Sequence, residues 1–111
     1  MSYQRACALA ELTEGTPLSV ELDGLDLALV REGDDVFAIE DECSHAAVAL
    51  SEGDVEGCTV ECWLHGSRFD LRTGKPTGLP ATEPVATFPV EVRGTDVYVD
   101  VSTTLNGVVP Q

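Results

Sequence analysis

The sequence predicts an all-β fold made of antiparallel sheets. Short segments alternate apolar and polar residues, and Gly, Asp and Thr recur between them, as in chains of short strands joined by tight turns. No segment indicates a long helix. With 111 residues the chain has room for one domain, which we expect to span residues 1–111.

The first strands are expected in the N-terminal third of the chain. Residues 18–22 and 25–30 alternate over much of their length, and Asp23-Gly24 between them is a strong signal for a two-residue hairpin turn. A second turn at residues 33–35 leads into a β-favouring segment at residues 36–39. These segments predict an antiparallel framework.

A second antiparallel pair is expected near the C-terminus. Residues 90–92 and 97–101 alternate and flank a turn at Gly94-Thr95. Between the early and late strands, residues 41–89 hold both histidines, three of the four cysteines and the only Trp. We therefore expect the functional site in this middle section.

Charge and hydropathy exclude several classes of partner. The formal net charge of −14 would repel phosphate backbones and anionic membrane surfaces, so no nucleic acid or membrane is expected. No stretch approaches the roughly 20 apolar residues of a membrane span, and Glu11 interrupts any signal-peptide core, so we expect a cytoplasmic protein. In a reducing compartment, metal ligation is a more natural use of cysteines than disulfides.

Two clusters of metal-binding residue types stand out in the middle section. Cys43-Ser44-His45 is followed, after 16 intervening residues, by Cys62-Trp63-Leu64-His65. Each cluster supplies one thiolate and one imidazole, and two sulfurs with two nitrogens suit zinc or an iron–sulfur cluster. Zinc fingers usually pair like with like, so zinc is the weaker fit, and a zinc-stabilised interaction module is the alternative.

Residues 43–45 together with residues 62–66 resemble the Rieske cluster motif, C-x-H followed by C-x-x-H-G. The similarity continues beyond the second cluster and covers about residues 36–101. Three further segments match the strand, the turn and the third, cluster-covering loop of Rieske ferredoxins: Ser67-Arg68-Phe69-Asp70, Thr73-Gly74-Lys75 and Gly78-Leu79-Pro80.

The resemblance implies a Rieske ISP-like domain, with antiparallel sheets or a sandwich and an inserted cluster-binding subdomain at about residues 41–81. It further implies one Rieske-type [2Fe-2S] cluster, in which Cys43 and Cys62 hold one iron and His45 and His65 hold the other. Because both histidines are used in this way, no catalytic residues are expected.

The implied function is that of a soluble one-electron carrier, most like the ferredoxin component of aromatic-ring dioxygenase systems. Its expected partners are a flavin-dependent reductase and a terminal oxygenase, and the carrier itself is expected to be a monomer. Service in iron–sulfur assembly, or a role like that of a nitrite reductase small subunit, is the alternative. Val48, Leu64 and Phe69 replace the disulfide cysteines and the tyrosine of high-potential Rieske proteins, which predicts a potential toward the low end of the Rieske range.

Three further residues near or outside the motif carry expectations of their own. Trp63 is expected to shield the cluster and pack its loop rather than relay electrons. Cys7 and Cys58 lie outside the ligand pairs, and both are expected to be buried free thiols.

Overall fold

The computed structural model describes residues 3–42, 49–63, 66–77 and 83–108, and the regular secondary structure in these ranges is almost entirely β-strand. The strands are β1 (Tyr3–Ala8), β2 (Leu18–Leu22), β3 (Leu25–Glu32), β4 (Asp35–Glu40), β5 (Val55–Glu56), β6 (Thr59–Glu61), β7 (Arg68–Asp70), β8 (Thr87–Phe88), β9 (Val90–Arg93) and β10 (Asp96–Asp100). Two short 3-10 helices accompany them, η1 (Leu9–Glu11) and η2 (Leu50–Glu52). Neither helix in these ranges has the length or apolar character to cross a membrane. The predicted all-β class is confirmed.

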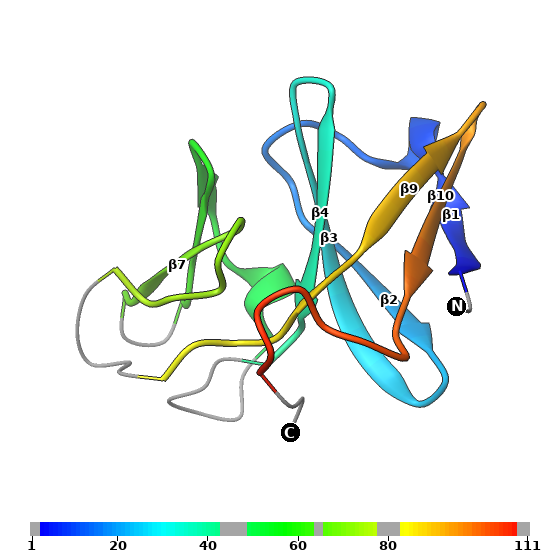
Figure 1. The fold of residues 1–111 in the computed structure, drawn as a ribbon. Helices are drawn as coiled ribbons and strands as arrows, with labels where there is room; N and C mark the ends of the chain where they lie inside the picture. Colours follow the sequence, from blue (N-terminus) through cyan, green and yellow to red (C-terminus); the bar gives the residue numbers. More distant parts are fainter. Residues whose placement is uncertain (1–2, 43–48, 64–65, 78–82, 109–111) are drawn as a thin grey trace.

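The strands form three antiparallel sheets. Their orders are β2-β3-β4-β8, β1-β10-β9 and β5-β6-β7. In Figure 1, β3 and β4 lie between β7 on one side and β1, β9 and β10 on the other. The β2-β3-β4-β8 sheet is therefore the central layer, and each of the other two sheets packs against one of its faces.

The predicted N-terminal hairpin is present and is formed by β2 and β3. Leu22 pairs with Leu25, and the intervening Asp23 and Gly24 have φ angles of 52° and 80°. Positive φ at both central residues is the geometry of a type I′ turn, which matches the twist of the two strands. The Asp-Gly pair therefore fixes the register of this hairpin.

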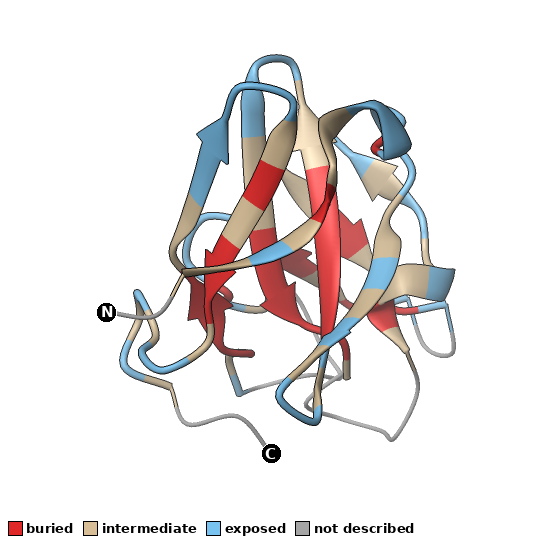
Figure 2. Ribbon diagram, turned by 90° about the vertical axis from the view of Figure 1, so that its right-hand side faces the viewer, coloured by how far each residue is buried: buried red, intermediate tan, exposed pale blue. Residues whose placement is uncertain are grey.

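Both faces of β3 are buried, which explains why its central residues are all apolar. Leu27 and Leu29 pack into a core shared with β1 and β10, whereas Ala28 and Val30 pack into a second core shared with the β5-β6-β7 sheet. All four side chains are fully buried, and the buried segments in Figure 2 concentrate on the strands at the centre of the molecule. The central layer therefore joins the two cores.

A corner at Pro89 joins the central sheet to the C-terminal one. β8 pairs with β4, and after Pro89 the same extended segment continues as β9 and pairs with β10. Proline has no N–H to donate to a ladder, so it is well placed where the segment changes from one sheet to the other. The predicted strand pair at 90–92 and 97–101 is confirmed, except that β10 ends at Asp100.

Candidate metal centre

Of the four predicted ligands, the structure describes Cys62. Cys43 and His45 fall in the range 43–48 and His65 falls in the range 64–65, and both ranges lie outside the described residues. Accordingly, no group of three metal-binding side chains occurs within the described part of the chain. The assignment of the four ligands stays a prediction. The described residues next to them define the surroundings of the candidate site.

Cys62 lies at the end of β6, where the chain reverses toward β7. Its N–H donates to the carbonyl oxygen of Ser67 at 2.6 Å, and its carbonyl oxygen accepts from the N–H of Gly66 at 2.9 Å. Gly66 has a φ of 78°, which favours glycine. Both Cys62 and Ser67 are 1% exposed, so the closed turn holds the thiol away from water.

The ends of the first predicted ligand segment are joined by a buried carboxylate. Asp41 accepts a hydrogen bond from the Ser51 N–H at 2.6 Å and others from the hydroxyls of Ser51 at 2.7 Å and Ser19 at 3.0 Å. Asp41 precedes the segment that contains Cys43 and His45, and Ser51 follows it. These contacts hold the segment's two ends together and tie them to β2.

We predict that Asp41→Ala lowers the free energy of unfolding by about 2 kcal/mol, because it leaves the Ser51 N–H without its charged acceptor in a buried setting. Urea denaturation of the protein as purified measures the change. Asp34→Ala, in the exposed turn after β3, is the matched control for the loss of one negative charge from a highly acidic protein. Equal stability of the two variants would show that the Asp41 contacts contribute little.

Described residues that flank the two predicted ligand segments lie close together. The N–H of Glu61, the residue before Cys62, donates to the carbonyl oxygen of Asp54 at 2.7 Å. Leu50, just after the first segment, is fully buried in the same core as Cys62. Gly53 allows this approach, because a Cβ there would lie 1.7 Å from the carbonyl oxygen of Glu61.

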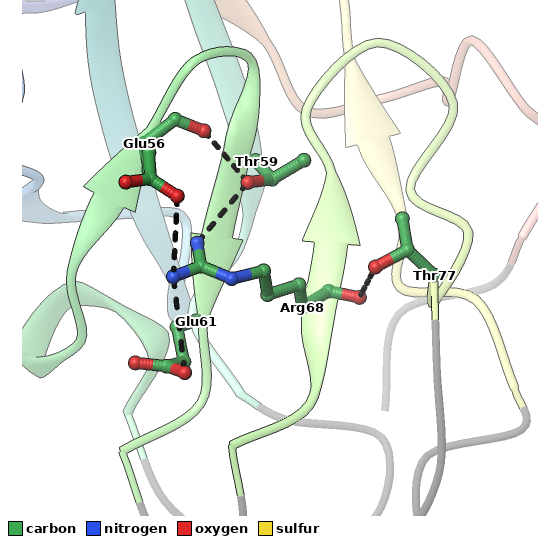
Figure 3. A network of polar contacts seen from close by, with 5 residues as sticks. All are labelled: Glu56, Thr59, Glu61, Arg68 and Thr77. Carbon is green, nitrogen blue, oxygen red and sulfur yellow. Dashed lines mark hydrogen bonds and ion pairs between the residues drawn. The ribbon is translucent and has the colours of Figure 1, made fainter.

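An ionic network on the small sheet holds its strands in place (Figure 3). Arg68 of β7 lies 3.7 Å from a carboxylate oxygen of Glu56 and 3.8 Å from one of Glu61, and it donates to the hydroxyl of Thr59 at 3.3 Å. Glu56 belongs to β5, and Thr59 and Glu61 belong to β6. The guanidinium of Arg68 therefore joins β7 to both of the other strands of this sheet. Each pair is partly exposed and contributes at most about 1 kcal/mol. The network's main effect is to fix β6 and β7 on either side of the Cys62 turn.

The cysteines outside the motif differ in their surroundings. Cys7 is buried in β1, and burial together with the negative charge of Glu11 raises the pKa of its thiol. Cys58 lies in the turn between β5 and β6 and is only partly buried, so the expectation that it is buried is wrong. Cys7, Cys58 and Cys62 are all free thiols. Cys7 lies outside the two ligand pairs, which leaves it a structural role in the core that β1 and β10 share with β3.

Trp63 is the described residue that follows Cys62. Trp63 is 51% exposed, so about half of its surface faces solvent rather than packing against the protein. The expectation that it shields the cluster rather than relays electrons stays a prediction. Trp63 lies in the turn after β6, where Cys62 faces the core and Trp63 itself faces solvent. An exposed indole next to a predicted ligand adds apolar surface at this end of the molecule.

The donor set fits a Rieske-type [2Fe-2S] cluster. Such a cluster needs two thiolates and two imidazoles, and the chain supplies two of each at motif spacing. The structure adds a buried thiol at Cys62 and a buried hydroxyl residue, Ser67, in the same closed turn. Phe69, at the position where high-potential Rieske proteins have tyrosine, is fully buried and has no hydroxyl to donate.

Comparison with known proteins agrees with this fit. Residues 2–89 match the model of the Rieske [2Fe-2S] domain. The 3-phenylpropionate/cinnamic acid dioxygenase ferredoxin subunit of Escherichia coli (strain K12) is 44% identical over 96 residues, which are 86% of this chain and 90% of that protein.

Two solved structures are similar over most of their length. The ferredoxin of carbazole 1,9a-dioxygenase from Nocardioides aromaticivorans IC177 superposes with a TM-score of 0.86 at 40% identity, covering 89% of this chain and 97% of that one. A ferredoxin chain in a complex of reduced oxygenase and oxidized ferredoxin of carbazole 1,9a-dioxygenase gives a TM-score of 0.82 at 40% identity, covering 87% and 91%.

Proposed function

This chain belongs to the Rieske [2Fe-2S] domain family, and from that premise we propose that it carries single electrons from a flavin-dependent reductase to a terminal oxygenase. The relatives named above are ferredoxin subunits of aromatic dioxygenase systems, and one of them was captured with its oxygenase. The observation that carries the proposal is a full set of thiol and imidazole donors at motif spacing, with Cys62 in a closed, buried turn.

In this proposal Cys43 and Cys62 hold one iron, and His45 and His65 hold the other. When bound, the cluster accepts and releases one electron. The protein's own contribution is to bury the Cys62 sulfur, to close the turn around it and to keep water from that side of the site. The histidines are the chain's only two, so binding the cluster leaves none for acid–base chemistry. The chain is an electron-transfer component, and substrate turnover belongs to the oxygenase.

The surface charge supports transient docking. A net charge of −14 on 111 residues steers the carrier toward a basic face and makes the encounter weaken as salt is added. Trp63, half exposed beside Cys62, supplies apolar area that such an interface would cover. We further propose that the carrier acts in the cytoplasm as a monomer.

The reduction potential tests the proposal. We expect direct voltammetry of the purified protein to give a one-electron wave toward the low end of the Rieske range of about −150 to +300 mV, since Phe69 donates no hydrogen bond to a ligand sulfur. Iron and zinc are assayed on the same sample. A potential well above zero would contradict the assignment to dioxygenase-type carriers, and zinc with no wave would favour a structural module instead.

A further inference from the structure

The opposite charges of Glu61 and Arg68 lie beside the turn that holds Cys62. Val60 and Phe69, their neighbours on β6 and β7, are fully buried. Side chains alternate along a strand, so Glu61 and Arg68 lie on the outer face of the small sheet. Figure 3 shows the Arg68 guanidinium directed toward the Glu61 carboxylate, and its Nη2 lies 3.8 Å from Glu61 Oε2. Both side chains are 31% exposed, so the pair is largely sheltered from water.

The Glu61 carboxylate reaches the glycine that closes this turn. Glu61 directly precedes Cys62, and its Oε2 lies 3.7 Å from the position that a Cβ at Gly66 would occupy. The Gly66 N–H in turn donates to the Cys62 carbonyl oxygen at 2.9 Å. The turn therefore has a carboxylate against its outer side, and the guanidinium of Arg68 lies next to that carboxylate. All four of these residues are in the described part of the chain.

We propose that Glu61 and Arg68 tune the reduction potential of the cluster through opposite electrostatic effects. The proposal rests on the proposed electron-carrier function, in which Cys62 is a cluster ligand. A negative charge near the cluster opposes the addition of an electron and lowers the potential, whereas a positive charge favours it and raises the potential. Cys62 and Ser67 are each 1% exposed, so water screens these charges less here than between groups on the open surface.

The sign of the change in potential separates this electrostatic role from a purely structural one. A structural role predicts that loss of either side chain loosens β6 against β7 and admits water. Water stabilises the added negative charge of the reduced state, so loosening raises the potential in both variants. The electrostatic role instead raises the potential in Glu61→Gln and lowers it in Arg68→Gln. Glu61→Gln removes the charge while keeping nearly the same volume, so it is the cleaner of the two variants.

Glu91 and Arg93 of β9 are the matched control pair. Their side chains lie 2.7 Å apart and are about half exposed, and their sheet packs on the other face of the central layer (Figure 1). Glu91→Gln and Arg93→Gln therefore remove the same charges at a greater and better screened distance, and both should leave the potential unchanged. Arg68→Lys is a second control, because it keeps the positive charge and should keep the potential of the unaltered protein.

The experiment is direct voltammetry of the holoproteins at low and at high salt, with iron content and visible absorption recorded on the same samples. Glu61→Gln should have a higher potential than the unaltered protein and Arg68→Gln a lower one, and the double variant should lie between them. Added salt should bring all three potentials closer to that of the unaltered protein, because ions screen partly exposed charges.

Three outcomes overturn the proposal: a rise in both single variants, no shift in either, or shifts as large in Glu91→Gln and Arg93→Gln. If Arg68→Gln contains no iron, Glu61→Gln and Arg68→Lys complete the test. A higher potential in Glu61→Gln with an unchanged one in Arg68→Lys then supports the proposal, and any other result contradicts it. The proposed function fails separately, because then the unaltered protein gives no one-electron wave.

Discussion

Purified Cys62→Ala protein should be colourless and contain almost no iron. In the proposed ligand set Cys62 supplies one of the two thiolates that a Rieske-type cluster requires. Its residue is buried in a turn closed by Ser67 and Gly66, where no other described thiol can replace it. Because binding of a metal group contributes directly to folding free energy, the variant should also unfold at a lower temperature. Iron analysis, visible absorption and thermal unfolding measure the three effects.

Cys58→Ala is the matched control for this experiment. Cys58 is four positions before Cys62 and on the same small sheet, but it lies in the turn between β5 and β6 and is only partly buried. Its replacement should keep the colour, the iron and the midpoint of unfolding close to those of the unaltered protein. Colour retained in Cys62→Ala would overturn the ligand assignment. Colour lost in both variants would mean that the small sheet itself, rather than one ligand, had been disrupted.

The strands that the sequence predicts well are those whose partners are nearby in the chain. β2, β3 and β4 are linked by two tight turns, and the Asp23-Gly24 turn alone sets the register of the first pair. β1 was not predicted, because it forms only by pairing with β10 at the other end of the chain, with a register shift between Arg5 and Cys7. Local alternation carries no information about such distant pairing.

The same distinction applies to the candidate metal centre. The four predicted ligands follow from residue type and spacing, both of which are visible in the sequence. Asp41 and Gly53 were missed, since their roles depend on which backbone groups approach them. A buried aspartate and a glycine with ordinary φ give no signal until Ser51 or Glu61 is placed beside them.

Gly53→Ala should lower the free energy of unfolding by about 3 kcal/mol, the upper range for forcing extra atoms into a packed site. The cause is steric rather than conformational. Gly53 has a φ of −90°, which any residue adopts, but a Cβ there would lie 1.7 Å from the carbonyl oxygen and 2.9 Å from the carbonyl carbon of Glu61. Both contacts are with backbone, so β6 itself would have to move away from Gly53.

That movement would displace Cys62, because it directly follows Glu61. It would also weaken the bond from the Glu61 N–H to the Asp54 carbonyl oxygen, which joins residues flanking the two predicted ligand segments. We therefore expect Gly53→Ala to lose iron faster than the unaltered protein when a chelator is added.

Gly57→Ala, in the turn of the same β5–β6 hairpin, is the control. Gly57 has a φ of 60° and no neighbour within 4 Å of a Cβ, so this change costs only the backbone strain of about 1–2 kcal/mol and should leave iron release unchanged. If both variants release iron at the same rate, general destabilisation of the hairpin accounts for the loss. If Gly53→Ala alone releases iron faster, the close approach of Gly53 to Glu61 sets the distance between the two halves of the proposed metal centre.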